Sequence, residues 1–530
     1  MKLYKLLTII TLGVGAVACN DMEQIPTNNF TDANYWTSPE RAQNVVNMAY
    51  SQMYDAGKFW GDESLSDNVI DANRVSDQRL IRRGMATTTI GLFEQWGGLY
   101  GGIKTCHVFL DHINDVAMEE SLRTRMTSEI RFARAYIFFR LANLYGAIPF
   151  FTKDITLDEA NTISRTPVSE VYSFIHTELD DIINTLPSRD QLSVEENGKI
   201  TKAAAAMLQA RVYLMESDWE NVAKYTKRIM DGEFGSYDLF PSYAGLFKEA
   251  NEYNCEVIFD RAYVPNMITW GEMIDMAPLS LGSRTVDRVP TQSLVDTYLT
   301  RGGYRIDEAG ADYDERNPYL NRDPRMTATI VYDGYKWKEN FGSGPEEIRT
   351  APGTGQDAYD PNNAATSKTG YYVAKYFAPQ GEGTLNSGLN IITMRYADVL
   401  LMYAEAMFEQ GLMTVDVWNN TIKPIRRRAG FTVPKALDYP GGDEAAMRRI
   451  IRDERRVEFA LEGLRWWDIK RWKAGSQYLT GPVCGATFNG TKLMVDTYEF
   501  DENRDYLWAV PQSQINLNNN LAPNNPGYSN

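Results

Sequence analysis

Apolar residues recur every three or four positions from about residue 36 to residue 232, with polar residues between them. This spacing is typical of amphipathic helices. One helix is expected to begin near Pro39 and to end at Gly57, and another covers the segment RFARAYIFFRLANLYGAIPF (131–150). Residues 202–232 are predicted to form two helices joined by a short turn. Stacked helix pairs of this kind, with degenerate likeness to tetratricopeptide repeats, would bury one continuous core.

The helical pattern disappears between residues 233 and 389, where Gly, Pro, Asn and Asp become frequent. Long irregular segments inside an ordered domain are uncommon unless they bind something or are disordered. Helices are predicted again within 390–472, at 391–411 and 443–472, and the tail (473–530) is rich in turns. The expected fold is therefore mainly α, with a tetratricopeptide-like helix-pair scaffold and an irregular, loop-rich lobe packed against it.

The amino terminus has the features of an export signal. Residues 1–18 combine two lysines with a short apolar stretch and small residues before the cut, and they are too short to span a membrane. The segment Ala16-Val17-Ala18-Cys19 is similar to a bacterial lipobox, although Ala16 replaces the usual large aliphatic residue. We therefore predict a lipid on Cys19 and a lipidated tether over residues 19–35. A secreted protein with an incidental cysteine is the alternative.

The net charge argues against nucleic acid as a ligand, and the cysteine count argues against a disulfide framework. The formal charge is −16, and loss of the two lysines with residues 1–18 would make it −18, which is a poor match for nucleic acid. Apart from Cys19, the chain holds Cys106, Cys255 and Cys484, an odd number that predicts no disulfide framework.

Several short motifs follow one another in a characteristic order. They are NRDPRM (321–326), TGYYVAKY (369–376), MRYADVLLMYAEA (394–406), IRDERRVEFALEGLRWWDIKRW (451–472) and NPGY (525–528). Together they closely resemble the SusD/RagB family of Bacteroidetes outer-membrane lipoproteins, and the resemblance covers nearly the whole mature chain. It divides the chain into an N-terminal SusD-like region (36–232) and a C-terminal SusD/RagB region (233–530).

The resemblance implies a function and a partner. Family members capture a nutrient, usually an oligosaccharide, at the cell surface and sit as a hinged lid over a SusC-like TonB-dependent outer-membrane transporter. It also implies a surface-facing, lipid-anchored location in the outer membrane, because Asp21 and Glu23 after Cys19 resemble the acidic export stretch of such lipoproteins. The alternative function is a peptide-binding lid of the same family, and a surface glycoside hydrolase is a third hypothesis.

We interpret the acidic residues of the motifs as partners in ion pairs rather than as catalytic residues. Glu454, Glu458 and Glu462 lie four apart, so they are expected to share a helix face and to need nearby cations, for which Arg455, Arg465 or Arg395 are candidates. An acid/base pair for glycoside cleavage is the less favoured interpretation. The three histidines form no H-E-x-x-H motif and no G-x-S-x-G motif occurs, so we predict no enzyme, no cofactor and no metal.

A glycan site needs aromatic rings for the apolar faces of the sugars and polar side chains for their hydroxyls. Trp270, Tyr335 and Trp337 lie in the irregular lobe among polar residues and glycines, and Trp60 follows an N-terminal helix, so these four are the candidate ligand-binding residues. Core packing is the alternative for each tryptophan.

Two polar clusters each have a ligand-binding interpretation beside a structural one. Arg74, Arg79, Arg82 and Arg83 offer positive charge to an acidic sugar, although a solvated face or ion pairs are more usual. The oxygen ligands that calcium prefers occur in DEAGADYDERN, at Asp307, Asp312, Asp314 and Asn317, where a polar surface loop is the alternative.

Overall fold

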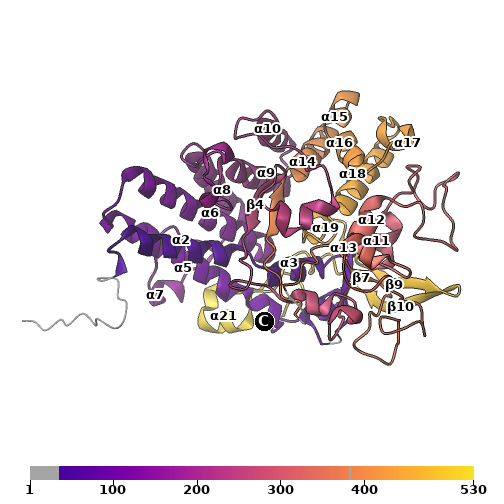
Figure 1. Ribbon diagram of the computed structural model, residues 1–530. Helices are drawn as coiled ribbons and strands as arrows, with labels where there is room; N and C mark the ends of the chain where they lie inside the picture. Colours follow the sequence, from indigo (N-terminus) through magenta and orange to yellow (C-terminus); the bar gives the residue numbers. More distant parts are fainter. Residues whose placement is uncertain (1–34, 74, 381–383, 530) are drawn as a thin grey trace, which may run out of the picture.

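The computed structural model describes residues 35–73, 75–380 and 384–529 of the chain (Figure 1). The predictions for Cys19, Asp21, Glu23 and Arg74 concern positions outside these ranges. Within them, no helix combines the length and the apolar character that crossing a membrane requires.

The first half of the chain is a layer of packed helices, drawn in indigo and purple in Figure 1. These are α2 (Pro39–Met53), α3 (Ala56–Glu63), α4 (Asp77–Arg82), α5 (Gln95–His112), α6 (Glu120–Tyr145), α7 (Leu157–Ala160), α8 (Val168–Ile182), α9 (Lys202–Glu216) and α10 (Trp219–Met230). Helix α5 packs on α2 and α6, α6 packs on α8, and α9 packs on α10. The predicted helical character is confirmed, and the tetratricopeptide likeness remains an expectation that this arrangement fits.

The helix predicted from Pro39 to Gly57 is two helices. The chain becomes extended at Tyr54 after α2, and Asp55 then caps α3 by accepting a hydrogen bond from the Lys58 amide at 2.8 Å. Gly57 therefore lies in the first turn of α3, so its prediction as a helix end was wrong.

The second half adds a further group of helices, drawn in orange in Figure 1, which begins where α14 packs on α10. The group comprises α14 (Tyr396–Glu409), α15 (Val415–Asn420), α16 (Ile422–Arg428), α17 (Pro434–Leu437), α18 (Glu444–Glu458) and α19 (Arg465–Arg471).

Two boundaries in this half differ from the prediction. Residues Ile391–Arg395 form strand β8, which pairs antiparallel with β4 (Val257–Arg261), so the helix begins only at Tyr396. The predicted 443–472 helix is interrupted between α18 and α19, where Leu461 and Gly463 adopt left-handed backbone conformations. Left-handed residues end an α-helix because their backbone turns away from the helix axis.

Short elements make up the loop-rich lobe and the tail. The lobe holds α11 (Gln292–Thr297), α12 (Pro324–Thr329) and α13 (Trp337–Phe341), and the tail holds α20 (Gly475–Tyr478) and α21 (Gln512–Leu517). Four further two-stranded antiparallel pairs are β1 (Val69–Asp71) with β5 (Arg288–Pro290), β2 (Ile148–Pro149) with β3 (Arg165–Thr166), β6 (Ile330–Val331) with β7 (Tyr372–Val373), and β9 (Gly481–Phe488) with β10 (Thr491–Tyr498). Asn489 and Gly490, both at positive φ, turn the last hairpin.

Candidate functional site

The four aromatic residues predicted to contact a ligand are almost completely buried. Their side chains are exposed by 1% for Trp60, 4% for Trp270, 1% for Tyr335 and 1% for Trp337. The structure brings them together as two pairs, with ring centroids 6.4 Å apart for Trp60 and Trp270 and 6.0 Å apart for Tyr335 and Trp337. The expectation of rings standing free at the surface is therefore wrong for this conformation.

Local packing explains why these rings are buried. Trp337 begins α13, stacks on Phe341 with centroids 4.1 Å apart and meets Phe377 edge-on at 4.8 Å. The indole N–H of Trp270 donates to the carbonyl oxygen of Leu389 at 2.8 Å, so it is already used. Glycines and polar residues beside a tryptophan do not reveal such contacts, because the covering residues come from distant parts of the chain.

Trp270 nevertheless borders an open hollow, which we call the Trp270 hollow. It is lined by Asp55, Ala56, Gly57, Tyr263, Thr269, Trp270, Gly271, Glu272 and Asp275, and its volume is about 530 Å³. The Tyr263 hydroxyl accepts a hydrogen bond from the Ala56 amide at 2.9 Å, and its own hydrogen has no acceptor among the described residues. The exposed Thr269 hydroxyl likewise has no hydrogen bond within the described chain.

Carboxylates dominate the polar wall of the Trp270 hollow. Glu272 accepts from the Gly271 amide at 3.1 Å, and Asp55 forms an ion pair with Lys58. Burial raises the pKa of Glu272 and of Asp275 above their ordinary values. No lysine or arginine is among the lining residues. The hollow therefore offers hydroxyl donors and carboxylate acceptors, with Trp270 as part of its wall.

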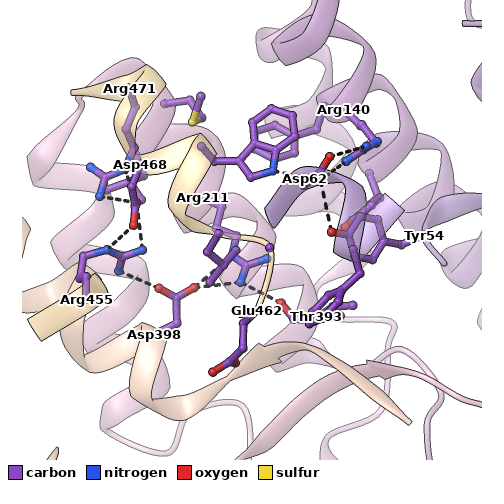
Figure 2. A pocket seen from close by; sticks show the side chains of 18 residues that line it. Tyr54, Asp62, Arg140, Arg211, Thr393, Asp398, Arg455, Glu462, Asp468 and Arg471 are labelled. Atoms are coloured by element: carbon purple, nitrogen blue, oxygen red, sulfur yellow. Dashed lines mark hydrogen bonds and ion pairs between the residues drawn. The ribbon is translucent and has the colours of Figure 1, made fainter. Parts of the chain in front are cut away.

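A second cavity, the helix-junction cavity, lies between the two helical halves (Figure 2). Its volume is about 90 Å³, and its charged lining consists of Asp62, Arg140, Arg211, Asp398, Arg455, Glu462, Asp468 and Arg471. Figure 2 shows Arg140 aimed at Asp62, while Asp398 lies between Arg211 and Arg455 at 2.9 and 2.8 Å.

Each of these charges has a partner of opposite sign within the protein. Arg455 and Arg471 both bind Asp468, at 3.1 and 2.9 Å, and Arg471 also binds Glu405. Because four acids face four arginines, the wall is close to neutral and its polar atoms are largely occupied. We therefore interpret this cavity as the joint between the helical halves.

The motif RWWDIKRW contributes to this joint. Trp466 is fully buried, whereas Trp467 is half-buried and lines the helix-junction cavity. Its indole N–H and the Tyr54 hydroxyl each donate to Asp62 at 3.2 Å. No sequence pattern predicts this cavity, because its paired residues come from opposite halves of the chain.

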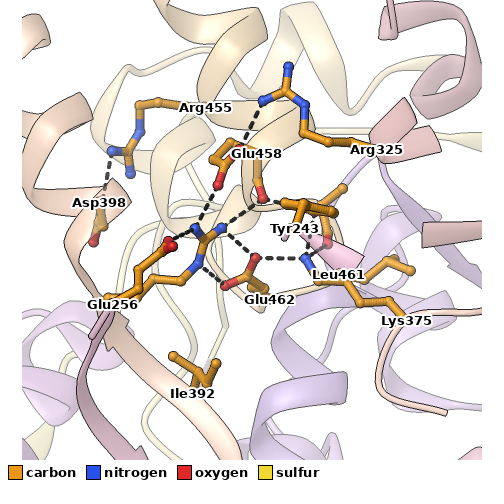
Figure 3. A network of polar contacts seen from close by, with 12 residues as sticks. Tyr243, Glu256, Arg325, Lys375, Ile392, Asp398, Arg455, Glu458, Leu461 and Glu462 are labelled. Carbon is orange, nitrogen blue, oxygen red and sulfur yellow. Dashed lines mark hydrogen bonds and ion pairs between the residues drawn. The ribbon is translucent and has the colours of Figure 1, made fainter. Parts of the chain in front are cut away.

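The row of glutamates on and after α18 forms buried ion pairs, as the structural interpretation predicted (Figure 3). Arg395 binds Glu458 at 2.6 Å and Glu462 at 2.7 Å, and Lys375 binds Glu462 at 2.6 Å. The same network, the Arg395 network, includes Glu256, Arg325, Arg426, Arg428 and Glu454.

Two details of that prediction need correction. Glu462 lies beyond the end of α18, and the interruption of the helix carries its carboxylate to Arg395. Arg455 and Arg465 do not serve this row, because Arg455 binds Asp398 and Asp468 while Arg465 binds Asp67 at 2.8 Å. The nearby arginines push the pKa of Glu458 well below its ordinary value. Carboxylates that are buried and ionised beside arginines lack the raised pKa of a general acid.

The other polar clusters do not converge on a site. Arg79 and Arg83 bind Asp496 at 2.7 and 3.3 Å, and Arg82 is buried. Asp307 binds Arg305, and Asp314 binds Asn317 within its own loop. Among the described residues, no group of three or more His, Cys, Asp and Glu side chains is placed to hold a metal ion. Cys106, Cys255 and Cys484 are all free thiols.

Comparison with known proteins gives relatives along the whole chain. A SusD-like protein of Formosa agariphila is 27% identical over 556 aligned residues, which cover 100% of both chains. The starch-binding protein SusD of Bacteroides thetaiotaomicron is 24% identical and covers 80% of this chain and 76% of its own. The structure of a SusD-like carbohydrate-binding protein from Bacteroides fragilis superposes with a TM-score of 0.83 at 27% identity, covering 92% of this chain and 99% of that one.

Two family models match in sequence order. A model described as starch-binding and associating with the outer membrane matches residues 20–214. The SusD family model matches residues 256–528, which is more than half of the chain and includes the motifs of the second half. The chain therefore belongs to the SusD family.

Proposed function

We propose that this protein is a non-catalytic, lipid-anchored glycan-binding protein of the outer membrane that captures an oligosaccharide or polysaccharide at the cell surface. It delivers the bound glycan to a SusC-like TonB-dependent transporter for import. Membership of the SusD family is the observation that carries this proposal. The family model of the N-terminal half is described by starch binding and outer-membrane association, and the Bacteroides fragilis neighbour is named for carbohydrate binding.

The Trp270 hollow is the position that we propose for the glycan. A sugar offers hydroxyl groups that both donate and accept hydrogen bonds, together with apolar C–H faces. The free hydroxyl hydrogen of Tyr263, the exposed Thr269 hydroxyl and the carboxylates of Glu272 and Asp275 match these groups. The helix-junction cavity is smaller, and its charges are occupied by one another. We propose that the lobe is stabilised by the packing of Trp60, Tyr335 and Trp337, and that these residues do not contact the glycan.

Native affinity electrophoresis of the protein in gels that contain individual polysaccharides tests the proposal. We expect retardation by at least one glycan, and weaker retardation of a Thr269→Ala variant. Thr269 is exposed, so this change leaves the packing of Trp270 in place. Thr432→Ala, at an exposed threonine outside the hollow whose hydroxyl has no hydrogen bond within the described chain, serves as the matched control. Retardation that Thr269→Ala leaves unchanged would remove the hollow from the proposal.

The alternatives give different outcomes in the same series. Binding of peptides with no retardation by any glycan would replace the proposal with a peptide-binding lid. Release of reducing ends during long incubation would indicate a glycoside hydrolase. The acids of the Arg395 network do not favour hydrolysis, because Glu454, Glu458 and Glu462 are buried and bound to basic side chains.

The anchor and the transporter need separate tests. We propose that Cys19 carries the lipid and that residues 19–35 tether the protein to the membrane. Cys19→Ala should move the protein from the membrane fraction to the soluble fraction of cells. Purification of the wild-type protein from outer membranes should recover the SusC-like transporter with it, and a preparation without that partner would contradict the proposed delivery step.

A further inference from the structure

The charge of the Trp270 hollow bears on the class of glycan that it takes, and this inference rests on the proposed function. Three of its nine lining residues, Asp55, Glu272 and Asp275, are acids, and no basic residue is among them. A cavity wall of one sign repels ligands of that sign, and the effect grows where water is displaced.

The basic residues near the hollow each contact a partner within the protein, and none of them is a lining residue. Lys58 binds Asp55, Arg288 lies 3.9 Å from Asp71 in the strand pair β1–β5, and the Arg261 guanidinium lies 5.1 Å from the ring centroid of Tyr263. Two further acids, Asp71 and Asp287, influence the same region.

The protonation behaviour of these acids agrees with the geometry. The pKa values of Asp71, Glu272, Asp275 and Asp287 are all raised, in each case chiefly by burial. Arg288 opposes this rise in all four, yet does not cancel it. Another negative charge would therefore enter a place where negative charge is already unfavourable.

We infer that the Trp270 hollow selects uncharged glycans and rejects chains that carry uronate or sulfate groups. Carboxylates accept hydrogen bonds and cannot donate them when ionised, so they pair with sugar hydroxyls and not with sugar carboxylates. Glu272 and Asp275 are the residues that determine this selectivity, because Asp55 is already bound to Lys58.

The test compares derivatives of one polysaccharide backbone. The neutral glucan that the protein binds best is compared with its carboxymethylated form and with a hydroxyethylated form of equal substitution, which has similar bulk without charge. We expect the carboxymethylated chain to bind at least tenfold more weakly than the hydroxyethylated chain at low salt. The difference should shrink as salt is added, because screening weakens the repulsion.

Two double variants locate the effect. Glu272→Gln with Asp275→Asn should reduce the difference between the charged and uncharged derivatives to less than threefold. Glu220→Gln with Asp416→Asn removes the same charge from exposed positions on α10 and α15 and should leave the difference intact. Equal reduction in both double variants would assign the selectivity to the net charge of the whole protein and overturn the inference.

The outcomes separate this inference from the proposed function. Equal or tighter binding of the carboxymethylated chain would overturn the charge selectivity while leaving glycan capture in place. Failure of every neutral and charged polysaccharide to bind would contradict the proposed function and the inference with it.

Discussion

Arg140 on α6 and Asp62 on α3 form a two-pronged buried ion pair, with hydrogen bonds of 2.8 and 3.0 Å between the guanidinium and the two carboxylate oxygens. Asp62 also accepts from Tyr54 and Trp467, so it receives hydrogen bonds from α6, from the end of α2 and from α19. This single carboxylate therefore joins the N-terminal helices to the C-terminal scaffold.

Asp62→Asn should destabilise the protein strongly. The change leaves the Arg140 guanidinium buried without its counter-charge, and breaking a buried pair in this way costs about 3–5 kcal/mol. The free energy of unfolding from urea denaturation measures the effect. Arg140→Met combined with Asp62→Leu should recover part of the loss, because no unpaired charge remains. A cost below about 1 kcal/mol for Asp62→Asn, as expected for the exposed control Asp416→Asn, would contradict the prediction.

Gly463→Ala should destabilise the interruption between α18 and α19. Gly463 has φ +72°, and an added Cβ would lie 3.0 Å from both the carbonyl oxygen of Phe59 and the Tyr54 hydroxyl. Gly411 has almost the same φ, +71°, with no atom within 4 Å of its added Cβ, so Gly411→Ala shows the backbone strain alone. That strain costs about 1–2 kcal/mol. Thermal denaturation of both variants should give a clearly lower Tm for Gly463→Ala than for Gly411→Ala. Equal Tm values would show that Phe59 and Tyr54 move away from the added Cβ at little cost.

Asp260 on β4 should make stability depend on pH near neutrality. Burial raises the pKa of its carboxyl group to about 7 from the ordinary 3.8. The folded state thus binds the proton more tightly than the unfolded state, so stability falls as pH rises from about 4 and is lowest above about 7. Asp260→Asn keeps the shape of the side chain but cannot titrate. In urea denaturation, the free energy of unfolding of the variant minus that of the wild type should therefore increase by about 4 kcal/mol between about pH 4 and pH 8. A difference that does not change with pH would refute the assignment.

Arg395→Lys should not be a conservative change. Arg395 uses all three guanidinium nitrogens, binding Glu256, Glu458 and Glu462, and a single ammonium group does not reproduce that fork. We expect a loss of at least about 2 kcal/mol in the free energy of unfolding. Arg301→Lys, at an exposed position whose side chain makes no hydrogen bond within the described residues, is the control. Similar stability of the two variants would count against the network as a source of stability.

The helical part of the fold was predictable because its signal is local. The recurrence of apolar residues every three or four positions predicts a helical region from about residue 36 to residue 232 without reference to the rest of the chain, and α2 to α10 lie within it. Strand β8 was missed because its ladder partner, β4, lies far away in the sequence. The interruption after α18 was missed because Leu461 continues the apolar stripe and reveals nothing of its left-handed backbone.

The candidate site was much less predictable. Trp270 was selected for its polar and glycine neighbours, yet its burial depends on Trp60 and on the backbone of Leu389. Thr269 and Tyr263 carry no distinctive sequence pattern, and their relevance comes only from sharing a hollow with Glu272. Of the three arginines predicted to lie near the glutamate row, only Arg395 binds Glu458. Arg325 and Arg428 also bind Glu458 and were not predicted.

The Arg395 network also has a consequence for the order in which the protein acquires its structure. Glu256 and Arg325 come from the loop-rich lobe, Arg428 from α16, and Glu458 from α18, so the complete network forms only when every segment from Glu256 to Glu462 is present. A chain truncated before α18 would hold Arg325, Arg395 and Arg428 without Glu454, Glu458 or Glu462. The C-terminal region should therefore assemble in one cooperative event rather than piece by piece, and partial chains should be targets for proteases.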